Sequence, residues 1–208
     1  MAYTIGLDIG STYTKGLILD SDKNIVGRAM KATGAKLKEA ADTVIGMTLE
    51  AAGIKKGDID YCITTGYGRH LYDERDLQVT DLTATARGCC FLFPATRTIL
   101  DIGGQTMKAS KIDELKRVQT FRLNDKCASG TGEFFKQQLG RMDMTLDDVA
   151  AVPEEACVFA LSSRCSVFMK SDCTHKLNKR EATTADIVVS LSDVMATKVV
   201  DFLNKARI

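Results

Sequence analysis

The sequence predicts a duplicated, mixed α/β fold in which three strands followed by helices occur twice along the chain. Apolar runs bounded by glycines and polar turns indicate three strands near the N-terminus and three more near the middle. Each set opens with a strand that ends in Asp-x-Gly, first at Asp8 and again at Asp101. Apolar residues at helical spacing follow both sets. This order differs from the strand-helix-strand repeat of a dinucleotide-binding fold.

The first half of the fold is expected at residues 1–95. Apolar runs predict strands, and apolar residues on one helical face predict helices. The strands are expected at residues 3–9, 14–19, 25–31 and 59–65, and the helices at 37–52 and 80–90. Gly53 is suited to cap the first helix, and Gly66-Tyr67-Gly68 closes the fourth strand.

The second half is expected at residues 96–208, with Pro94 at the join between the halves. Its first three apolar runs repeat the opening of the chain, and longer amphipathic stretches follow them. Strands are predicted at residues 98–102, 107–112 and 118–123, and helices at 130–141, 145–151, 166–176 and 184–205.

Composition narrows the classes of function. Hydrophobic residues make up 45% of the 208 residues, which is typical of a globular protein. Lys and Arg number 28 against 27 Asp and Glu, so no strong field favours nucleic acid or an anionic membrane as partner. No apolar run reaches the ~18 residues of a membrane span. The N-terminus reads directly into a strand and lacks the pattern of a signal peptide, so we expect a cytoplasmic protein.

The first Asp-x-Gly turn has the chemistry of a phosphate-binding loop. Its residues are Asp8-Ile9-Gly10-Ser11-Thr12-Tyr13-Thr14-Lys15. A glycine directly after a strand lets backbone N–H groups approach phosphate oxygens, while the hydroxyls and Lys15 add donors and positive charge. A carboxylate at the strand end, here Asp8, can hold Mg²⁺ directly or through water.

The second turn, Asp101-Ile102-Gly103-Gly104-Gln105, repeats this arrangement. Asp101 or Gln105 could orient an attacking water, so the candidate catalytic residues are Asp8, Asp101 and Gln105. A single such turn is more often an ordinary glycine-rich β-turn, but two copies at equivalent places favour nucleotide binding. Neither turn matches the P-loop or the dinucleotide fingerprint.

Seven cysteines are a high number for a cytoplasmic domain. Cys127 and Cys165 each precede a predicted helix, where the helix dipole favours a thiolate. Two cysteines from each chain of a symmetric dimer would suit a [4Fe–4S] cluster. From spacing alone, buried thiols or a redox pair remain open for both, and a three-ligand group of Cys157, Cys165 and Cys173 is a further alternative.

Several runs together resemble a known family. They are Gly6-Leu7-Asp8-Ile9-Gly10-Ser11-Thr12, Thr65-Gly66-Tyr67-Gly68-Arg69, Asp101-Ile102-Gly103-Gly104-Gln105, Asn124-Asp125-Lys126-Cys127 with Gly130-Thr131-Gly132, and Ser162-Ser163-Arg164-Cys165-Ser166-Val167-Phe168. Nearly the whole chain is spanned in order. The sequence resembles the ATP-dependent activators of 2-hydroxyacyl-CoA dehydratases, a group that includes the ATPase subunits of benzoyl-CoA reductase.

The resemblance implies ribonuclease-H-like halves of the actin, sugar-kinase and Hsp70 type. It implies ATP or ADP with Mg²⁺ at the two loops, with Gly130, Thr131 and Gly132 among the nucleotide-binding residues. It further implies a homodimer that bridges one [4Fe–4S] cluster through Cys127 and Cys165 of each chain. ATP hydrolysis would drive electron transfer from ferredoxin or flavodoxin to an iron–sulfur acyl-CoA dehydratase or reductase.

One departure from the family concerns the C-terminal part of the second half. Members continue past the long helix into a strand and a glycine-pair loop that grips adenosine, whereas this sequence stops at Ile208. We therefore expect a truncated second half. The alternative functions are a non-redox ATPase or small-molecule kinase of the same fold, or a truncated relative without catalysis.

Overall fold

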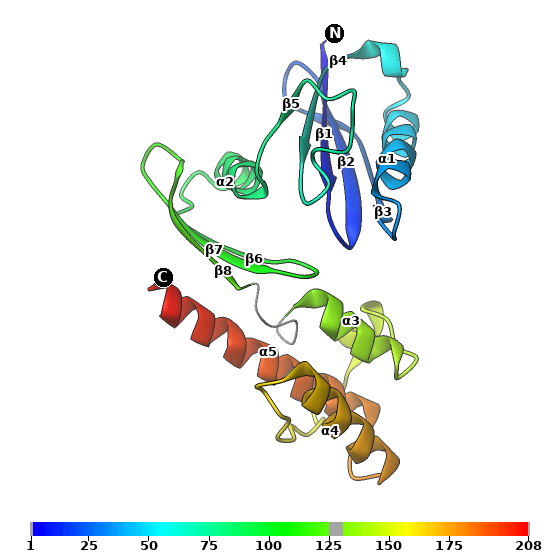
Figure 1. The fold of residues 1–208 in the computed structure, drawn as a ribbon, viewed down its shortest axis with the longest axis vertical. Coiled ribbons are helices and arrows are strands. Elements are labelled where there is room, and N and C mark those ends of the chain that lie inside the picture. Colours follow the sequence, from blue (N-terminus) through cyan, green and yellow to red (C-terminus); the bar gives the residue numbers. More distant parts are fainter. Residues whose placement is uncertain (1, 125–130, 208) are drawn as a thin grey trace. The chain divides into compact units, whose positions relative to one another are not determined.

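The computed structural model describes residues 2–124 and 131–207. The chain divides into two compact units, shown with their elements in Figure 1. Unit 1 comprises Met1–Thr96 and Glu114–Val118, and unit 2 comprises Arg97–Asp113 and Gln119–Ile208. Each unit contains a sheet and helices of its own.

The elements of unit 1 open with a hairpin and a third strand, as the sequence predicts. They are β1 (Tyr3–Ile9), β2 (Tyr13–Leu19), β3 (Ile25–Ala32), α1 (Leu37–Ala52), the 3₁₀ turn η1 (Lys56–Asp58), β4 (Ile59–Thr65), β5 (Leu77–Gln78) and α2 (Asp81–Leu92). In unit 2 the elements are β6 (Thr98–Ile102), β7 (Met107–Ile112), β8 (Val118–Asn124), α3 (Gly132–Gly140), the 3₁₀ turn η3 (Asp147–Ala151), α4 (Ser166–Asn178) and α5 (Thr184–Ala206).

The sheet of unit 1 is mixed, with the strand order β3-β2-β1-β4-β5 in the described part of the chain. The β1–β2 and β2–β3 pairs are antiparallel, whereas β4 joins β1 in parallel. Asp8 therefore faces Lys15 across one edge of β1 and Thr65 across the other. This register places the end of the first Asp-x-Gly strand between two neighbouring strands.

Helix α1 packs directly on one face of this sheet, beside β2 and β3 (Figure 1). Two strand glycines make this close approach of α1 possible. A Cβ at Gly27 would lie 2.6 Å from the backbone oxygen of Thr48, and a Cβ at Gly16 would overlap the Thr48 hydroxyl. Any larger residue at either position would force α1 away from the strands.

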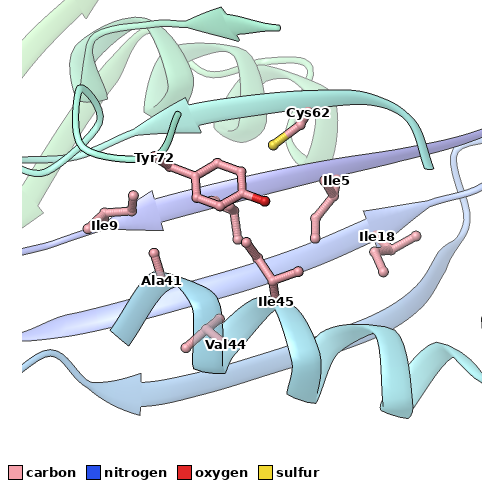
Figure 2. Close-up of a cluster of buried hydrophobic side chains, with 9 residues drawn as sticks. Ile5, Ile9, Ile18, Ala41, Val44, Ile45, Cys62 and Tyr72 are labelled. Atoms are coloured by element: carbon pink, nitrogen blue, oxygen red, sulfur yellow. The ribbon is translucent and has the colours of Figure 1, made fainter. Parts of the chain in front are cut away.

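The core of unit 1 lies between α1 and the strands, as Figure 2 shows. Its buried members are Ile5, Leu7, Ile9, Ile18, Ala41, Val44, Ile45, Cys62 and Tyr72. The odd positions of β1 face this core because strand side chains alternate between the two faces. Complete burial of each large aliphatic side chain contributes about 1.5–3 kcal/mol.

The opposite face of the same sheet carries a broad apolar groove of about 1090 Å³. It is lined by side chains from the strands of unit 1 and by Thr83, Ala84 and Arg87 of α2. Leu17 and Leu19 of β2 form part of its apolar wall, and Asp8 and Lys15 are charged residues of its lining. The first phosphate-loop carboxylate thus belongs to the face that α1 leaves uncovered.

Unit 2 combines the sheet β6-β7-β8 with a helical core. The strands β6 and β7 form an antiparallel hairpin in which Asp101 faces Lys108. Helices α3, α4 and α5 bury one cluster, consisting of Phe134, Met169, Cys173, Ile187, Leu191 and Val194. Within the described ranges, no helix is long and apolar enough to cross a membrane.

The sequence prediction differs from the structure at short elements. The two-residue strand β5 was not predicted, and it exists because Leu77 and Gln78 pair with Ile63 and Thr64 of β4. The predicted helix at 145–151 is a 3₁₀ turn, Asp147–Ala151. Within this turn, the Asp148 carboxylate accepts from the Thr145 N–H at 2.6 Å. Such local side-chain bonds compete with a longer helix.

Candidate functional site

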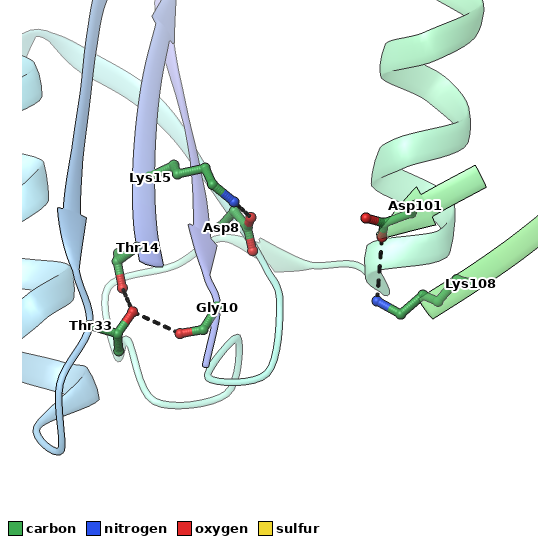
Figure 3. A network of polar contacts seen from close by, with 7 residues as sticks. All are labelled: Asp8, Gly10, Thr14, Lys15, Thr33, Asp101 and Lys108. Carbon is green, nitrogen blue, oxygen red and sulfur yellow. Dashed lines mark hydrogen bonds and ion pairs between the residues drawn. The ribbon is translucent and has the colours of Figure 1, made fainter. Parts of the chain in front are cut away.

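The first turn is tight, and its glycine is sterically required. The Gly10 N–H donates to the Tyr13 carbonyl at 3.1 Å, and a Cβ at Gly10 would lie 2.6 Å from that oxygen. The Thr33 hydroxyl donates to the Gly10 carbonyl at 2.8 Å and lies 2.9 Å from the Thr14 hydroxyl (Figure 3). The Thr14 side chain is fully buried, so it braces the loop from inside.

Asp8 forms an ion pair with Lys15 at one end of the groove of unit 1. The Lys15 Nζ atom lies 2.8 Å from Asp8 Oδ2, and the two side chains are 53% and 36% exposed. The other carboxylate oxygen, Oδ1, faces the loop after β4: a Cβ at Gly66 would overlap it and lie 2.7 Å from the Ile9 carbonyl. Gly66 also has a φ of +86°, which favours glycine.

Thr65 adds an oxygen next to Asp8. The Thr65 side-chain oxygen is buried and has no hydrogen-bond partner among the described residues. Thr65 lies beside Asp8 in the register of β1 and β4. A carboxylate beside an unpaired hydroxyl suits a hydrated divalent cation, whose ligands are oxygen atoms. The residues at the end of β1 therefore fit Mg²⁺ held directly or through water.

The turn between β6 and β7 repeats the geometry of the first. The Gly103 N–H donates to the Thr106 carbonyl at 2.8 Å, as Gly10 does to Tyr13. Lys108 Nζ lies 3.7 Å from Asp101 Oδ2, across the strand pair, as Figure 3 shows. The Lys108 side chain is only 14% exposed, so this pair is better shielded from water than Asp8–Lys15. Gln105 is exposed at the tip of the turn.

Helix α3 begins directly against this second turn. The N–H groups of Gly132 and Glu133 donate to the Gly103 and Gly104 carbonyls at 3.1 and 2.9 Å. Thr131, which precedes the helix, is buried. The structure thus brings Thr131 and Gly132 together with the second loop. Gly130 and Cys127, the other predicted residues of this segment, lie outside the described residues.

Cys165 is the N-cap residue of α4, as its helix-start motif predicts, and its side chain is partly exposed. The three-cysteine alternative fails: Cys157 is exposed, Cys173 is buried, and no group of three metal-ligating side chains converges in the described part of the chain.

The pattern of one protein family, described as the BadF/BadG/BcrA/BcrD ATPase family, matches residues 5–208. The chain belongs to this family of ATPases. It is 38% identical over 177 residues to the activator of lactoyl-CoA dehydratase from Anaerotignum propionicum, and the match covers 85% of the chain and 68% of that relative. The family resemblance that the sequence motifs indicate is confirmed.

Two solved structures of relatives superpose on nearly the whole chain. Component A of (R)-2-hydroxyglutaryl-CoA dehydratase from Acidaminococcus fermentans has a TM-score of 0.90 and 32% identity, covering 99% of this chain and 79% of its own. The activator of 2-hydroxyisocaproyl-CoA dehydratase from Clostridium difficile, with bound ADPNP, gives 0.91 and 34%, covering 98% and 76%. This ATPase therefore has the actin, sugar-kinase and Hsp70-like fold.

Burial separates Cys62, Cys90 and Cys173 of this ATPase from the partly exposed Cys165. Desolvation raises the pKa of the Cys62 thiol to about 11, and the pKa of Cys173 likewise to about 11. Both stay protonated at neutral pH and pack as small apolar groups. Cys90 is also buried, in α2.

Sequence reasoning missed Lys108, Thr33 and Thr65 at these loops. A signal for Lys108 was present, since it follows Asp101 at the same seven-residue spacing by which Lys15 follows Asp8. Thr33 carried no comparable signal, because it reaches Gly10 from the far end of β3, 23 residues away in sequence. Thr65 stood in a family motif, but only its register with Asp8 reveals its place.

Proposed function

We propose that this chain is an ATP-hydrolysing activator that delivers a low-potential electron to an acyl-CoA dehydratase or aromatic acyl-CoA reductase. The electron would travel through a [4Fe–4S] cluster bridging two copies of the chain. Family membership supports the ATPase half of the proposal, and the relatives named as activators of acyl-CoA dehydratases support the partner. Ferredoxin or flavodoxin is the proposed electron source.

Each turn supports its own roles in nucleotide binding and hydrolysis. Asp8, with Thr65 beside it, would hold Mg²⁺ or its water ligands, and the backbone of Gly10, Ser11, Thr12 and Tyr13 would face phosphate oxygens. Asp101 or Gln105 would orient the attacking water, with Lys108 fixing the Asp101 carboxylate. The Lys15 ammonium would leave Asp8 for a phosphate when Mg²⁺ binds.

The observation that carries the electron-transfer half is the position of Cys165 as N-cap of α4. A partly exposed cysteine at a helix start is a suitable cluster ligand, and Cys127 would supply the second cysteine ligand of each chain. When bound, a [4Fe–4S] cluster supplies one-electron chemistry at low potential. The exposed Val167 and Phe168 of the same helix turn would help exclude water at the contact between copies.

We also propose that residues 1–95 and 96–208 are duplicated halves whose relative motion couples ATP hydrolysis to electron transfer. The matched turns support duplication. Both contain a glycine N–H bonded to the carbonyl three residues on, and both contain an Asp–Lys pair at the same spacing.

The test is an anaerobic preparation assayed for iron, acid-labile sulfide, ATP hydrolysis and sedimentation. The parent protein should be brown, dimeric and active in ATP hydrolysis. Cys165→Ser should lose iron and dissociate, because the cluster ties the two chains together. Cys157→Ser is the matched control, since Cys157 is exposed and belongs to no described metal group, and should keep parent iron.

Three results would overturn parts of the proposal. A colourless parent that still hydrolyses ATP would make the chain a non-redox ATPase or kinase of this fold. A parent without iron or turnover would point to a relative that lost catalysis. Iron retained in Cys165→Ser would contradict the ligand assignment alone.

A further inference from the structure

The segment that leads into Cys165 has no regular secondary structure, yet its backbone is anchored at three points. We define it as the approach segment, residues 157–164. The N–H groups of Cys157, Phe159 and Ser162 donate to side chains of helices α5 and α4 at 2.7, 2.8 and 2.8 Å. A segment outside a sheet normally leaves such groups to water, so three side-chain acceptors indicate a defined backbone path.

Two of the anchors come from one face of α5. Asp186 Oδ1 accepts from Cys157, and Ser190 Oγ accepts from Phe159. The acceptors are four residues apart, about 6 Å along the helix, and the donors are two residues apart, about 6.5 Å along an extended chain. One helical turn therefore matches alternate N–H groups of the approach segment.

The α5 anchors are themselves held in place. Asp186 Oδ2 accepts from the Thr183 N–H and hydroxyl at 2.8 and 2.7 Å, which fixes the carboxylate at the start of the helix. Ser190 is fully buried, and its hydroxyl donates to the Asp186 carbonyl at 2.6 Å. Neither acceptor is a freely rotating surface group.

The third anchor comes from α4, the helix that Cys165 caps. Asp172 Oδ2 accepts from the Ser162 N–H. Asp172 lies seven residues after Cys165, which is two turns further along nearly the same face of α4. Bonds from the Ser162 hydroxyl and N–H hold the pKa of the Asp172 carboxyl below its ordinary value, so it is ionised at neutral pH. Lys176, one turn further, places its ammonium 4.7 Å from the Phe159 ring.

These contacts close a short loop around Cys165. Ser162 is tied to α4 by Asp172, and Leu161 packs against the helical core, so little freedom remains between Ser162 and the helix start. A cluster ligand has to meet its metal at fixed geometry, and groups behind ligands tune affinity by about 10–100-fold.

We propose that Asp172, Asp186 and Ser190 are positioning residues for Cys165, which fix the path of the approach segment so that the sulfur is preset for metal binding. The inference rests on the proposed function, in which Cys165 ligates the cluster. Asp172 is the decisive member because it lies on the same helix as Cys165.

The experiment compares Asp172→Ala, Asp172→Asn and Ser190→Ala with Asp193→Ala. Asn keeps an acceptor oxygen for the Ser162 N–H, whereas Ala removes it. Asp193 is an exposed carboxylate on α5 without a hydrogen-bond partner among the described residues, so it is the matched control. Three readouts are taken: iodoacetamide labelling of Cys165 in iron-free protein, amide hydrogen exchange at residues 157–162, and iron release to a chelator with the cluster EPR spectrum.

Asp172→Ala should label Cys165 about 10-fold faster, release iron about 10-fold faster and alter the EPR spectrum. Ser190→Ala should speed exchange at Phe159, and Asp172→Asn and Asp193→Ala should stay within about threefold of the parent. Parent rates of labelling and exchange in both Asp172→Ala and Ser190→Ala would overturn the inference. An iron-free parent would contradict the proposed function instead. Cysteine labelling and amide exchange in the iron-free protein would still decide whether Asp172 and Ser190 fix the approach segment.

Discussion

Asp8 and Lys15 face each other across the β1–β2 pair, with 2.8 Å between the ammonium nitrogen and Oδ2, and the same cross-strand relationship recurs between Asp101 and Lys108 at 3.7 Å. Each lysine neutralises a carboxylate that ends the first strand of a hairpin. A divalent cation arriving at Asp8 therefore has to compete with Lys15. Because both side chains of that pair are partly exposed, the ion pair contributes at most about 1 kcal/mol and is readily exchanged.

Asp8→Ala and Asp101→Ala should each lower the rate of ATP hydrolysis by roughly 100-fold or more, since metal and water positioning would be lost. The thermal midpoint should change little for Asp8→Ala, because the pair it breaks is weak. Steady-state ATP hydrolysis and thermal unfolding measure both effects. Asp73→Ala, which removes an exposed carboxylate paired with Lys38, is the matched control and should hydrolyse ATP at the parent rate. Parent activity in either Asp8→Ala or Asp101→Ala would refute the role of that residue.

Gly66→Ala should destabilise the protein by about 1–3 kcal/mol and disturb Asp8. The new Cβ would overlap the Asp8 carboxylate at a backbone φ of +86°. Denaturant unfolding, together with Mg²⁺-dependent nucleotide binding, measures the loss. Gly46→Ala in α1 is the control, because a Cβ at Gly46 would have no neighbouring atom within 4 Å. This substitution should stabilise the helix by about 1 kcal/mol. Equal stability of the two variants would contradict the strained position of Gly66.

Local patterns account for the parts of the site that the sequence predicts. Asp8, Gly10, Asp101 and Gly103 are readable because a strand end and a glycine turn are encoded by neighbouring residues. The helix start at Cys165 is likewise local, since the cysteine directly precedes α4. In the structure, each of these features is formed by residues that are adjacent in the sequence.

The unpredicted parts depend on contacts between residues distant in sequence. Asp172 could not be linked to Ser162, nor Ser190 to Phe159, because a side chain that accepts a backbone N–H leaves no periodic signal. The strand β5 was not predicted for a similar reason. Two residues are too few to show an alternation of apolar and polar side chains, and only their pairing with β4 makes them a strand.

Iodoacetamide at pH 8 should modify Cys157 and leave Cys62 and Cys173 unmodified in the folded protein. Burial raises the pKa of both thiols to about 11, so roughly a thousandth of either is ionised at that pH. Cys157 is exposed on the approach segment. Peptide mass spectrometry after a short pulse gives the pattern, and the same pulse in denaturant should label all three. Rapid labelling of Cys62 in the folded state would show that the core of unit 1 opens.

The capping carboxylate of α5 should make the protein less stable in acid. Hydrogen bonds from the Thr183 N–H, the Thr183 hydroxyl and the Cys157 N–H hold the pKa of Asp186 below its ordinary 3.8. The folded state therefore releases this proton more readily than the unfolded chain. The resulting stabilisation is complete above pH 3.8 and is lost as the pH falls through the lower folded-state pKa.

Thermal unfolding from neutral pH down to acid tests this dependence. Asp186→Asn should unfold at a lower temperature than the parent at neutral pH, and the difference should shrink as acid protonates Asp186 in the parent. Asp193→Asn, which alters a carboxylate of the same helix without a hydrogen-bond partner in the described ranges, should follow the parent curve throughout. If Asp186→Asn kept the parent's full acid dependence, the hydrogen bonds of Thr183 and Cys157 to Asp186 would not favour its ionised form, and α5 would begin without its carboxylate cap.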